Sequence, residues 1–230
     1  MPLSVAQTDL VNRLLSRLDA DTPGNNVVGG ESALYDQILF ATRQMILDRR
    51  VPDRMLHAIV STDTAGANTN HSDTTYGLVV PLKSDFLRLF RLKVSGWRRP
   101  VHHDDLLEED DPDVERLVAG GHTADAASPL ACLSYLASPP DGYSSSAILC
   151  FPGSTSDDPV EELVYIADDV APENLSADLQ ELVLWLSASI VMQSLDPEVA
   201  AMCESRYSDS LQRLGRSRKT RAKRSYRYLP

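Results

Sequence analysis

The residue types that most readily bind a metal ion gather at His102, His103, Asp104 and Asp105. Imidazole and carboxylate groups are both zinc ligands. Adjacent residues of an extended strand point to opposite faces, so these four side chains cannot converge on one ion without ligands from elsewhere. We therefore predict no metal site here, and we interpret the four residues as a polar strand end that runs into an acidic loop. No motif predicts a bound cofactor.

The acidic loop, residues 104–115, has eight carboxylates in twelve residues. It lacks the ligand spacing of an EF-hand and the glycine at its turn position. Carboxylates without a fixed geometry bind ions weakly, so we expect a solvated or partner-facing loop. Its charge would also suit a contact with a cationic segment of another subunit.

Motifs for nucleophilic catalysis or phosphate binding are missing from the sequence. It contains no GxSxG, no glycine-rich phosphate loop and no HExxH. The serine run 144–146 lacks a basic or glycine-rich frame. Cys132, Cys150 and Cys203 are far apart and form no CxxC, which indicates buried, reduced thiols. We predict that the protein is not an enzyme.

The last fifteen residues, RSRKTRAKRSYRYLP, form a basic arm (residues 216–230) with seven Lys or Arg and no acid. Three interpretations fit: a solvated chain end, a nucleic-acid-binding arm that stacks Tyr226 and Tyr228 on bases, or a docking segment that becomes ordered on a partner. In residues 225–229, SYRYL, tyrosines alternate with other residues, a pattern that suits the addition of a strand to a sheet edge. We therefore favour the docking interpretation. The predicted partner-binding residues are Arg216, Arg218, Lys219, Arg221, Lys223, Arg224, Tyr226, Arg227, Tyr228 and Leu229.

The charge distribution is asymmetric. The net charge of the 230 residues is −11, so the 215 residues outside the basic arm sum to about −18. Such a body repels nucleic acid unless one face is locally basic. No apolar run is long enough for a membrane span, and residues 1–10 lack the features of a secretory signal, so we expect no membrane partner.

Helical periodicity occurs at both ends of the chain. Ser4 and Gln7 have the spacing of a capping box that opens a helix to about Ala20. A second helix is predicted from about Glu31 to Arg49. The predicted inward residues of these two helices are Val5, Leu10, Val11, Leu14, Leu15 and Leu18, and then Leu34, Ile38, Ala41 and Met45.

Two further helices are predicted near the C-terminus. The first, about Ala177 to Leu195, has an apolar stripe, and the second opens with Asp196-Pro197-Glu198. We expect Gly215 to end it. The predicted inward residues are Leu179, Leu182, Val183, Leu186, Ile190 and Val191, and then Ala200, Cys203, Tyr207, Leu211 and Leu214.

Between the helix pairs lie short runs that are rich in β-branched and aromatic residues. The predicted strands are Tyr76–Leu82, Phe86–Val94, Trp97–Val101, Leu130–Ala137, Ala147–Phe151 and Glu162–Ile166, with Met55–Val60 open to either helix or strand. Apolar and polar residues alternate only partly along Phe86–Val94, which predicts either a bulged strand or a strand that is buried on both faces. Residues 61–75 and 104–129 are predicted to be exposed loops.

The fold class predicted from this order is α+β. A helical bundle from the N- and C-terminal helix pairs would carry an inserted antiparallel β-rich block and an extended C-terminal tail, because nothing alternates β-α-β. The predicted divisions are 1–60 for the first helices, 61–170 for the β-rich subdomain with its acidic loop, 171–214 for the helical hairpin and 215–230 for the docking tail.

Three stretches carry a likeness to a known family: the helix pair that ends near Arg49, VVPLKSDFLRLFRLKVSGWRRPV, and the segment from ELVYIADD to CESRYSDSL. The second has a Pro-Leu-x-x-Asp-Phe turn before a strand that ends in a Trp. The third has a Tyr-Ile strand end, an Ala/Ser-rich helix and a helix with Ala and Tyr spacing. Together they cover about two-thirds of the chain, and in pattern and order they resemble the head–tail connector proteins of tailed double-stranded DNA bacteriophages, also called adaptor, neck or ring proteins.

The resemblance implies a virion protein assembled in the host cytoplasm. Its subunits would form a ring, commonly of twelve, between the portal and the tail. Residues 216–230 would grip the portal protein, and the strand block would face tail or neck proteins or the lumen, where DNA passes. Without the resemblance, the alternative is a small nucleic-acid-binding or packaging accessory protein that uses the basic arm.

Overall fold

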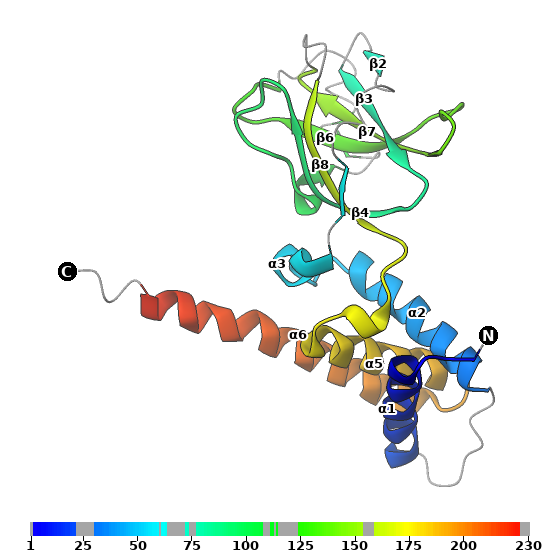
Figure 1. The fold of residues 1–230 in the computed structure, drawn as a ribbon. Helices are drawn as coiled ribbons and strands as arrows, with labels where there is room; N and C mark the ends of the chain where they lie inside the picture. Colours follow the sequence, from blue (N-terminus) through cyan, green and yellow to red (C-terminus); the bar gives the residue numbers. More distant parts are fainter. Residues whose placement is uncertain are drawn as a thin grey trace. The chain divides into compact units, whose positions relative to one another are not determined.

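The computed structural model describes residues 2–21, 30–59, 61–63, 72–73, 77–107, 111–112, 114, 124–153 and 159–225. Contacts divide the chain into two compact units: a helical unit, Met1–Ala58 with Val170–Pro230, and a β unit, Ile59–Asp169. The helical unit is therefore built from both ends of the chain, with the strands inserted between them (Figure 1). The predicted α+β class is confirmed.

The helical unit begins with two amphipathic helices, α1 (Val5–Asp21) and α2 (Glu31–Leu47). The capping box at the start of α1 is present, because Gln7 N–H donates to Ser4 Oγ and Ser4 N–H donates to Gln7 Oε1. The predicted inward residues of both helices are buried except Val5, which is exposed, and Leu15, which is half-buried. The sequence left helix and strand as alternatives for Met55–Val60. As far as it is described, this segment is helical and belongs to α3 (Asp53–Leu56) and a 3-10 turn, η1 (His57–Ile59).

A 3-10 turn, η4 (Pro172–Asn174), leads into α5 (Ala177–Met192), which contacts α1, α2 and α6. Because α5 has neighbours on several sides, its buried surface is wider than one stripe and includes Leu184, Ala188 and Met192. Three residues predicted to point inward, Leu186, Ile190 and Val191, are only half-buried. That part of the predicted stripe is wrong.

Helix α6 (Pro197–Ser225) packs on α5 through the predicted residues Ala200, Cys203, Tyr207 and Leu211, while Leu214 is half-buried. The helix does not end at Gly215. A glycine within a helix costs only about 1 kcal/mol, and the residues that follow include several good helix formers, so one glycine is a weak stop. Figure 1 shows the C-terminal part of α6 reaching beyond α5.

The β unit contains two sheets. One has the order β1-β8-β4 and the other has the order β2-β3-β7-β6-β5. Their pairings are antiparallel except β5 with β6, which is parallel. The strands are β1 (Ser61–Asp63), β2 (Ser72–Asp73), β3 (Leu78–Lys83), β4 (Phe86–Val94), β5 (Leu106–Leu107), β6 (Leu130–Tyr135), β7 (Tyr143–Phe151) and β8 (Val160–Ala167).

Predicted and observed strands differ in several places. The segment Trp97–Val101 is not a strand; it makes a turn and one bridge, Val101 to Leu92. Residues 61–75 were predicted to be loop, and the described part of that segment contributes the short strands β1 and β2. Residues 104–129 were also predicted to be an exposed loop, but Leu106–Leu107 form β5, and Leu106 and Val114 are buried. The irregular alternation of β4 is confirmed as bulges, because its register against β8 shifts three times.

The core of the β unit is formed by apolar residues of both sheets. Trp97 closes it, since its indole is 3% exposed and its Nε1–H donates to the Pro152 carbonyl at 2.9 Å. Gly96 precedes it with φ +91°, a conformation that L side chains rarely adopt. The turn at residues 95–96 thus directs the Trp97 side chain inward.

Candidate docking surface

The candidate metal ligands at residues 102–105 form a turn. His102 caps a 3-10 helix, η3 (His103–Asp105), with Asp105 accepting from its backbone N–H, and its Nδ1 lies 3.0 Å from the Phe90 carbonyl oxygen. Asp104 lies 3.9 Å from the buried guanidinium of Arg88. Within the described part of the chain, no group of three or more His, Cys, Asp or Glu residues could hold a metal ion.

The serine and cysteine side chains considered as nucleophiles take part in strand pairing or in core packing. Ser144 Oγ donates to the Leu82 carbonyl and accepts from the Ser146 N–H, so it joins two strands. The three cysteines are buried and form no disulfide, and burial raises the pKa of the Cys150 thiol, which keeps it protonated. These surroundings suit packing and do not activate a nucleophile.

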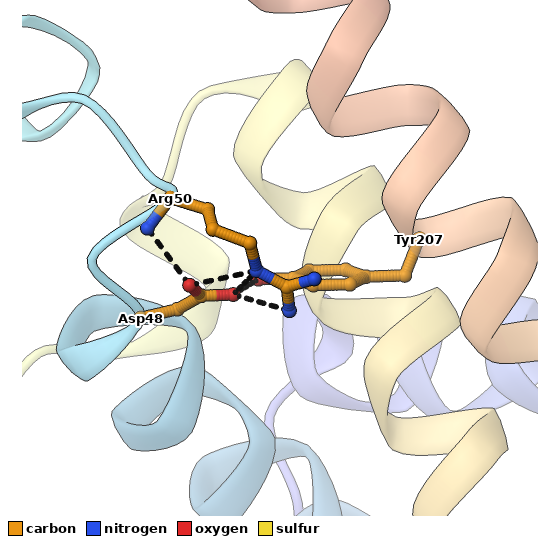
Figure 2. A network of polar contacts seen from close by, with 3 residues as sticks. All are labelled: Asp48, Arg50 and Tyr207. Atoms are coloured by element: carbon orange, nitrogen blue, oxygen red, sulfur yellow. Dashed lines mark hydrogen bonds and ion pairs between the residues drawn. The ribbon is translucent and has the colours of Figure 1, made fainter.

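A polar cluster of the helical unit joins the end of α2 to α6. The Asp48 carboxylate accepts from the backbone N–H, Nε and Nη2 of Arg50 at 2.8–3.0 Å, and from the Tyr207 hydroxyl at 2.8 Å. The Arg50 guanidinium carbon lies 5.5 Å from the centre of the Tyr207 ring. Figure 2 shows the guanidinium stacked on this ring, with Asp48 bridging the two side chains. We call these three residues the Asp48 cluster.

Electrostatics in the Asp48 cluster favour the charged pair. Burial pushes the pKa of the Asp48 carboxyl up, but the hydrogen bonds from Arg50 and Tyr207 outweigh burial and leave it below its usual value. The hydrogen bond to Asp48 raises the pKa of Arg50. Burial, and then the bond to Asp48, raise the pKa of Tyr207, so its hydroxyl stays a donor. The cluster therefore holds α6 at a fixed point on α2.

A second polar cluster fixes the chain as it enters α5. Gln7 on α1 donates to the Tyr35 hydroxyl at 3.1 Å and to Glu173 at 3.0 Å, and the Tyr35 hydroxyl donates to Glu173 at 2.7 Å. Burial and the bond to Glu173 raise the pKa of Tyr35 to about 12. The three residues are far apart in sequence, and of them only Gln7 is marked by a local pattern, the capping box.

The basic arm continues the helix that the Asp48 cluster holds. Leu211, one turn after Tyr207, is 7% exposed and is the last fully buried residue of the described α6 side chains. The backbone stays helical through Ser225, so six of the predicted partner-binding residues lie on α6: Arg216, Arg218, Lys219, Arg221, Lys223 and Arg224. The other four, Tyr226, Arg227, Tyr228 and Leu229, lie outside the described residues.

An apolar groove of about 460 Å³ opens between α2 and the end of α5. It is lined by Ala33, Leu34, Gln37, Ile190, Val191, Ser194 and Leu195. Leu195 is 47% exposed, and Phe40, one helical turn beyond Gln37 on α2, is 48% exposed. The half-buried residues of α5 thus contribute to a partly apolar surface.

Residues from two stretches that the sequence analysis singled out meet in the β unit. The Tyr165 hydroxyl on β8 donates to Asp85 in the β3–β4 turn at 3.1 Å, and the Tyr165 ring centre lies 5.6 Å from that of Phe86. The Pro-Leu-x-x-Asp-Phe turn and the Tyr-Ile strand end therefore form one packed corner.

Comparison with known proteins assigns no relationship. No protein-family model matches this chain, and no curated protein matches it in sequence. Among the helices as far as they are described, none has both the length and the apolar character that crossing a bilayer demands.

Proposed function

We propose that this chain is a structural subunit of a head–tail connector: a ring in the virion neck that joins the capsid portal to the phage tail. The basic arm would dock on the portal protein, and the β unit would meet tail or further neck proteins. The proposal assigns the chain no catalysis and no cofactor.

The observation that carries the proposal is a basic helix that continues from a fixed base. The Asp48 cluster and Leu211 hold α6 on α2 and α5, and ten more helical residues, 216–225, follow Gly215. At a rise of 1.5 Å per residue, those ten residues reach about 15 Å. Six of them are Lys or Arg and none is acidic. A rigid base with a cationic extension suits attachment to a larger assembly better than a free chain end does.

The apolar groove supports the oligomeric part of the proposal. A helix that is apolar on most of its faces is normally buried on all of them. Along α5 the half-buried residues Leu186, Ile190 and Val191 leave that burial incomplete. Contact with a neighbouring subunit would complete it, as ring interfaces do.

A second function, nucleic-acid binding through the basic arm, rests on the same seven cations. The net charge of about −18 on the remaining residues opposes it, because DNA approaching the arm is repelled by the body.

The test is copurification of the full chain with the portal protein of the same phage. Replacing Arg216, Arg218, Lys219 and Arg221 by Gln should weaken capture by the portal by about tenfold or more, because charge-assisted contacts are lost. A matched control replaces four exposed arginines outside the arm by Gln: Arg98, Arg99, Arg206 and Arg213. The proposal fails if both variants bind the portal equally well.

A further inference from the structure

One edge of the five-stranded sheet is open along part of its length. Strand β5 pairs with β6 only at Ala131 and Cys132, so within the described part of the chain no strand lies beside residues 133–135 on the side away from β7. The side chains on this stretch are apolar and exposed, 38% for Leu133 and 70% for Tyr135.

The hydrogen-bond phase of β6 directs its free backbone groups outward. The Leu136 N–H donates to the Ser145 carbonyl, so Leu136 and Ser145 form a hydrogen-bonded pair. Antiparallel pairs alternate, which makes Ser134 with Ala147 the next hydrogen-bonded pair. The N–H and C=O groups of Leu133 and Tyr135 therefore point away from β7, towards the open edge.

Among the described residues, a second edge of the same sheet is also open, and this edge is protected. Beyond β2, strand β3 carries Pro81 and Lys83. The same alternation turns the Pro81 nitrogen, which has no hydrogen to donate, towards the open side. Proline and lysine on an edge prevent pairing with another chain. Residues 130–137 contain neither proline nor a charge. The β6 edge thus lacks the protection that the β3 edge has.

Charge decides what could pair with the β6 edge. The exposed Asp104 and Asp105 immediately precede β5, the neighbour of β6. Two copies that paired β6 to β6 would supply no cation to these acids, because residues 130–137 carry no charge. An extended segment with Lys or Arg beside its apolar residues would instead complement the acids.

We infer that the β6 edge, Leu133–Tyr135, takes the C-terminal segment of a second copy of this chain as an added strand. That segment has the required chemistry: residues 225–229 alternate tyrosine with serine or arginine, and five cations lie between residues 218 and 224. Added-strand binding draws affinity from backbone hydrogen bonds and specificity from alternate side chains, here Leu133 and Tyr135 against tyrosine.

This inference does not depend on the connector proposal. If the portal also takes the C-terminal segment, the two sites compete, and the β6 edge holds the segment before the portal is met. Loss of one binding activity leaves the other testable, because the edge residues and the portal are measured separately.

The experiment measures binding of a labelled synthetic peptide, residues 221–230, to the full chain by fluorescence anisotropy. Tyr135→Pro removes an outward N–H without breaking the β6–β7 ladder, and we expect it to weaken binding about tenfold or more. Tyr135→Lys, which protects the edge by charge, should do the same without a change in backbone. The matched control is Val5→Lys on α1, where an 89% exposed apolar residue is replaced.

The outcomes separate the alternatives. Weaker binding in both Tyr135 variants, with Val5→Lys unchanged, supports the inference. Equal binding by all variants overturns it, and so does equal binding of a peptide with the same composition in scrambled order, which would show attraction by charge alone. Self-association that survives an excess of the peptide but is lost in both Tyr135 variants would point to β6–β6 pairing and would also overturn it.

Discussion

The Asp48 carboxylate accepts hydrogen bonds from four donor groups, three on Arg50 and one on Tyr207, while its side chain is 16% exposed. Its pKa is below the ordinary value, so the folded state favours the ionised form. The resulting stability is present above the unfolded pKa of about 4 and is lost as the pH falls through the folded value. We expect Asp48→Asn to lower the free energy of unfolding by about 1–3 kcal/mol at pH 7 and by less at about pH 3.

Urea unfolding of the full chain at both pH values measures this difference. Asp36→Asn on the same helix is the control, because Asp36 is exposed. An equal loss for Asp48→Asn at both pH values would mean that the carboxylate charge contributes nothing to holding α6.

Gly77 lies where the β unit allows no side chain. A Cβ at this position would be 2.4 Å from the Cys150 carbonyl oxygen and 3.1 Å from the Phe151 ring. Gly77→Ala must therefore move the backbone of β3 or β7, and we expect a loss of about 1–3 kcal/mol in unfolding free energy. Gly30→Ala is the control, because a Cβ there meets nothing within 4 Å. A Gly77→Ala protein with the thermal midpoint of the unchanged chain would contradict this packing.

At the scale of elements, the passage of α6 through Gly215 links stability to docking. A glycine inside a helix costs about 1 kcal/mol relative to alanine, so Gly215→Ala should extend the time-averaged helix into the basic arm. Circular dichroism at 222 nm should show more helix in this variant and less in Gly215→Pro. If Gly215→Ala leaves helicity unchanged and Gly215→Pro does not lower it, the helix ends at Gly215 in solution.

Local pattern predicted most of the elements. Spacing of apolar residues located α1, α2, α5 and α6, and β4 has its predicted bounds of Phe86–Val94. The pattern failed where tertiary contacts determine the local conformation or the burial of a residue. Trp97–Val101 has strand-forming residues, yet it serves as a turn that delivers Trp97 to the core. The half-buried part of α5 was predicted to be inward because one helix face alone does not reveal how many neighbours the helix has.

The clusters that position the candidate surface could not be predicted in this way. Asp48 and Tyr207 are separated by 159 residues, and Tyr35 and Glu173 by 138. Each residue is unremarkable where it stands in the sequence: Asp48 follows a helix, and Tyr207 belongs to an apolar stripe. Only the meeting of both chain ends in the helical unit brings them together. The basic arm, in contrast, is a contiguous stretch of the sequence, so its composition identifies it without the structure.

At the scale of the whole molecule, the burial of a residue predicts whether its substitution affects assembly or folding. Leu195 lines the groove and is 47% exposed, so Leu195→Asp should leave the chain folded but reduce its self-association or its ring formation on the portal. Ala188, fully buried on α5, is the contrasting position, because an aspartate there would be buried without a partner and should unfold the helical unit. Mass photometry with circular dichroism distinguishes the two. Unchanged assembly by Leu195→Asp would remove the groove from the subunit interface.

The charge of the whole molecule makes the last prediction. A body of about −18 with seven cations at one end should bind double-stranded DNA weakly at physiological salt, because a duplex long enough to occupy the arm also approaches the acidic body. Portal binding should persist under the same conditions, since it depends on shape complementarity as well as on charge. The measurement is a salt titration of both partners. A DNA affinity in the nanomolar range, with a steep salt slope that the four Gln substitutions abolish, would favour the nucleic-acid function over the connector.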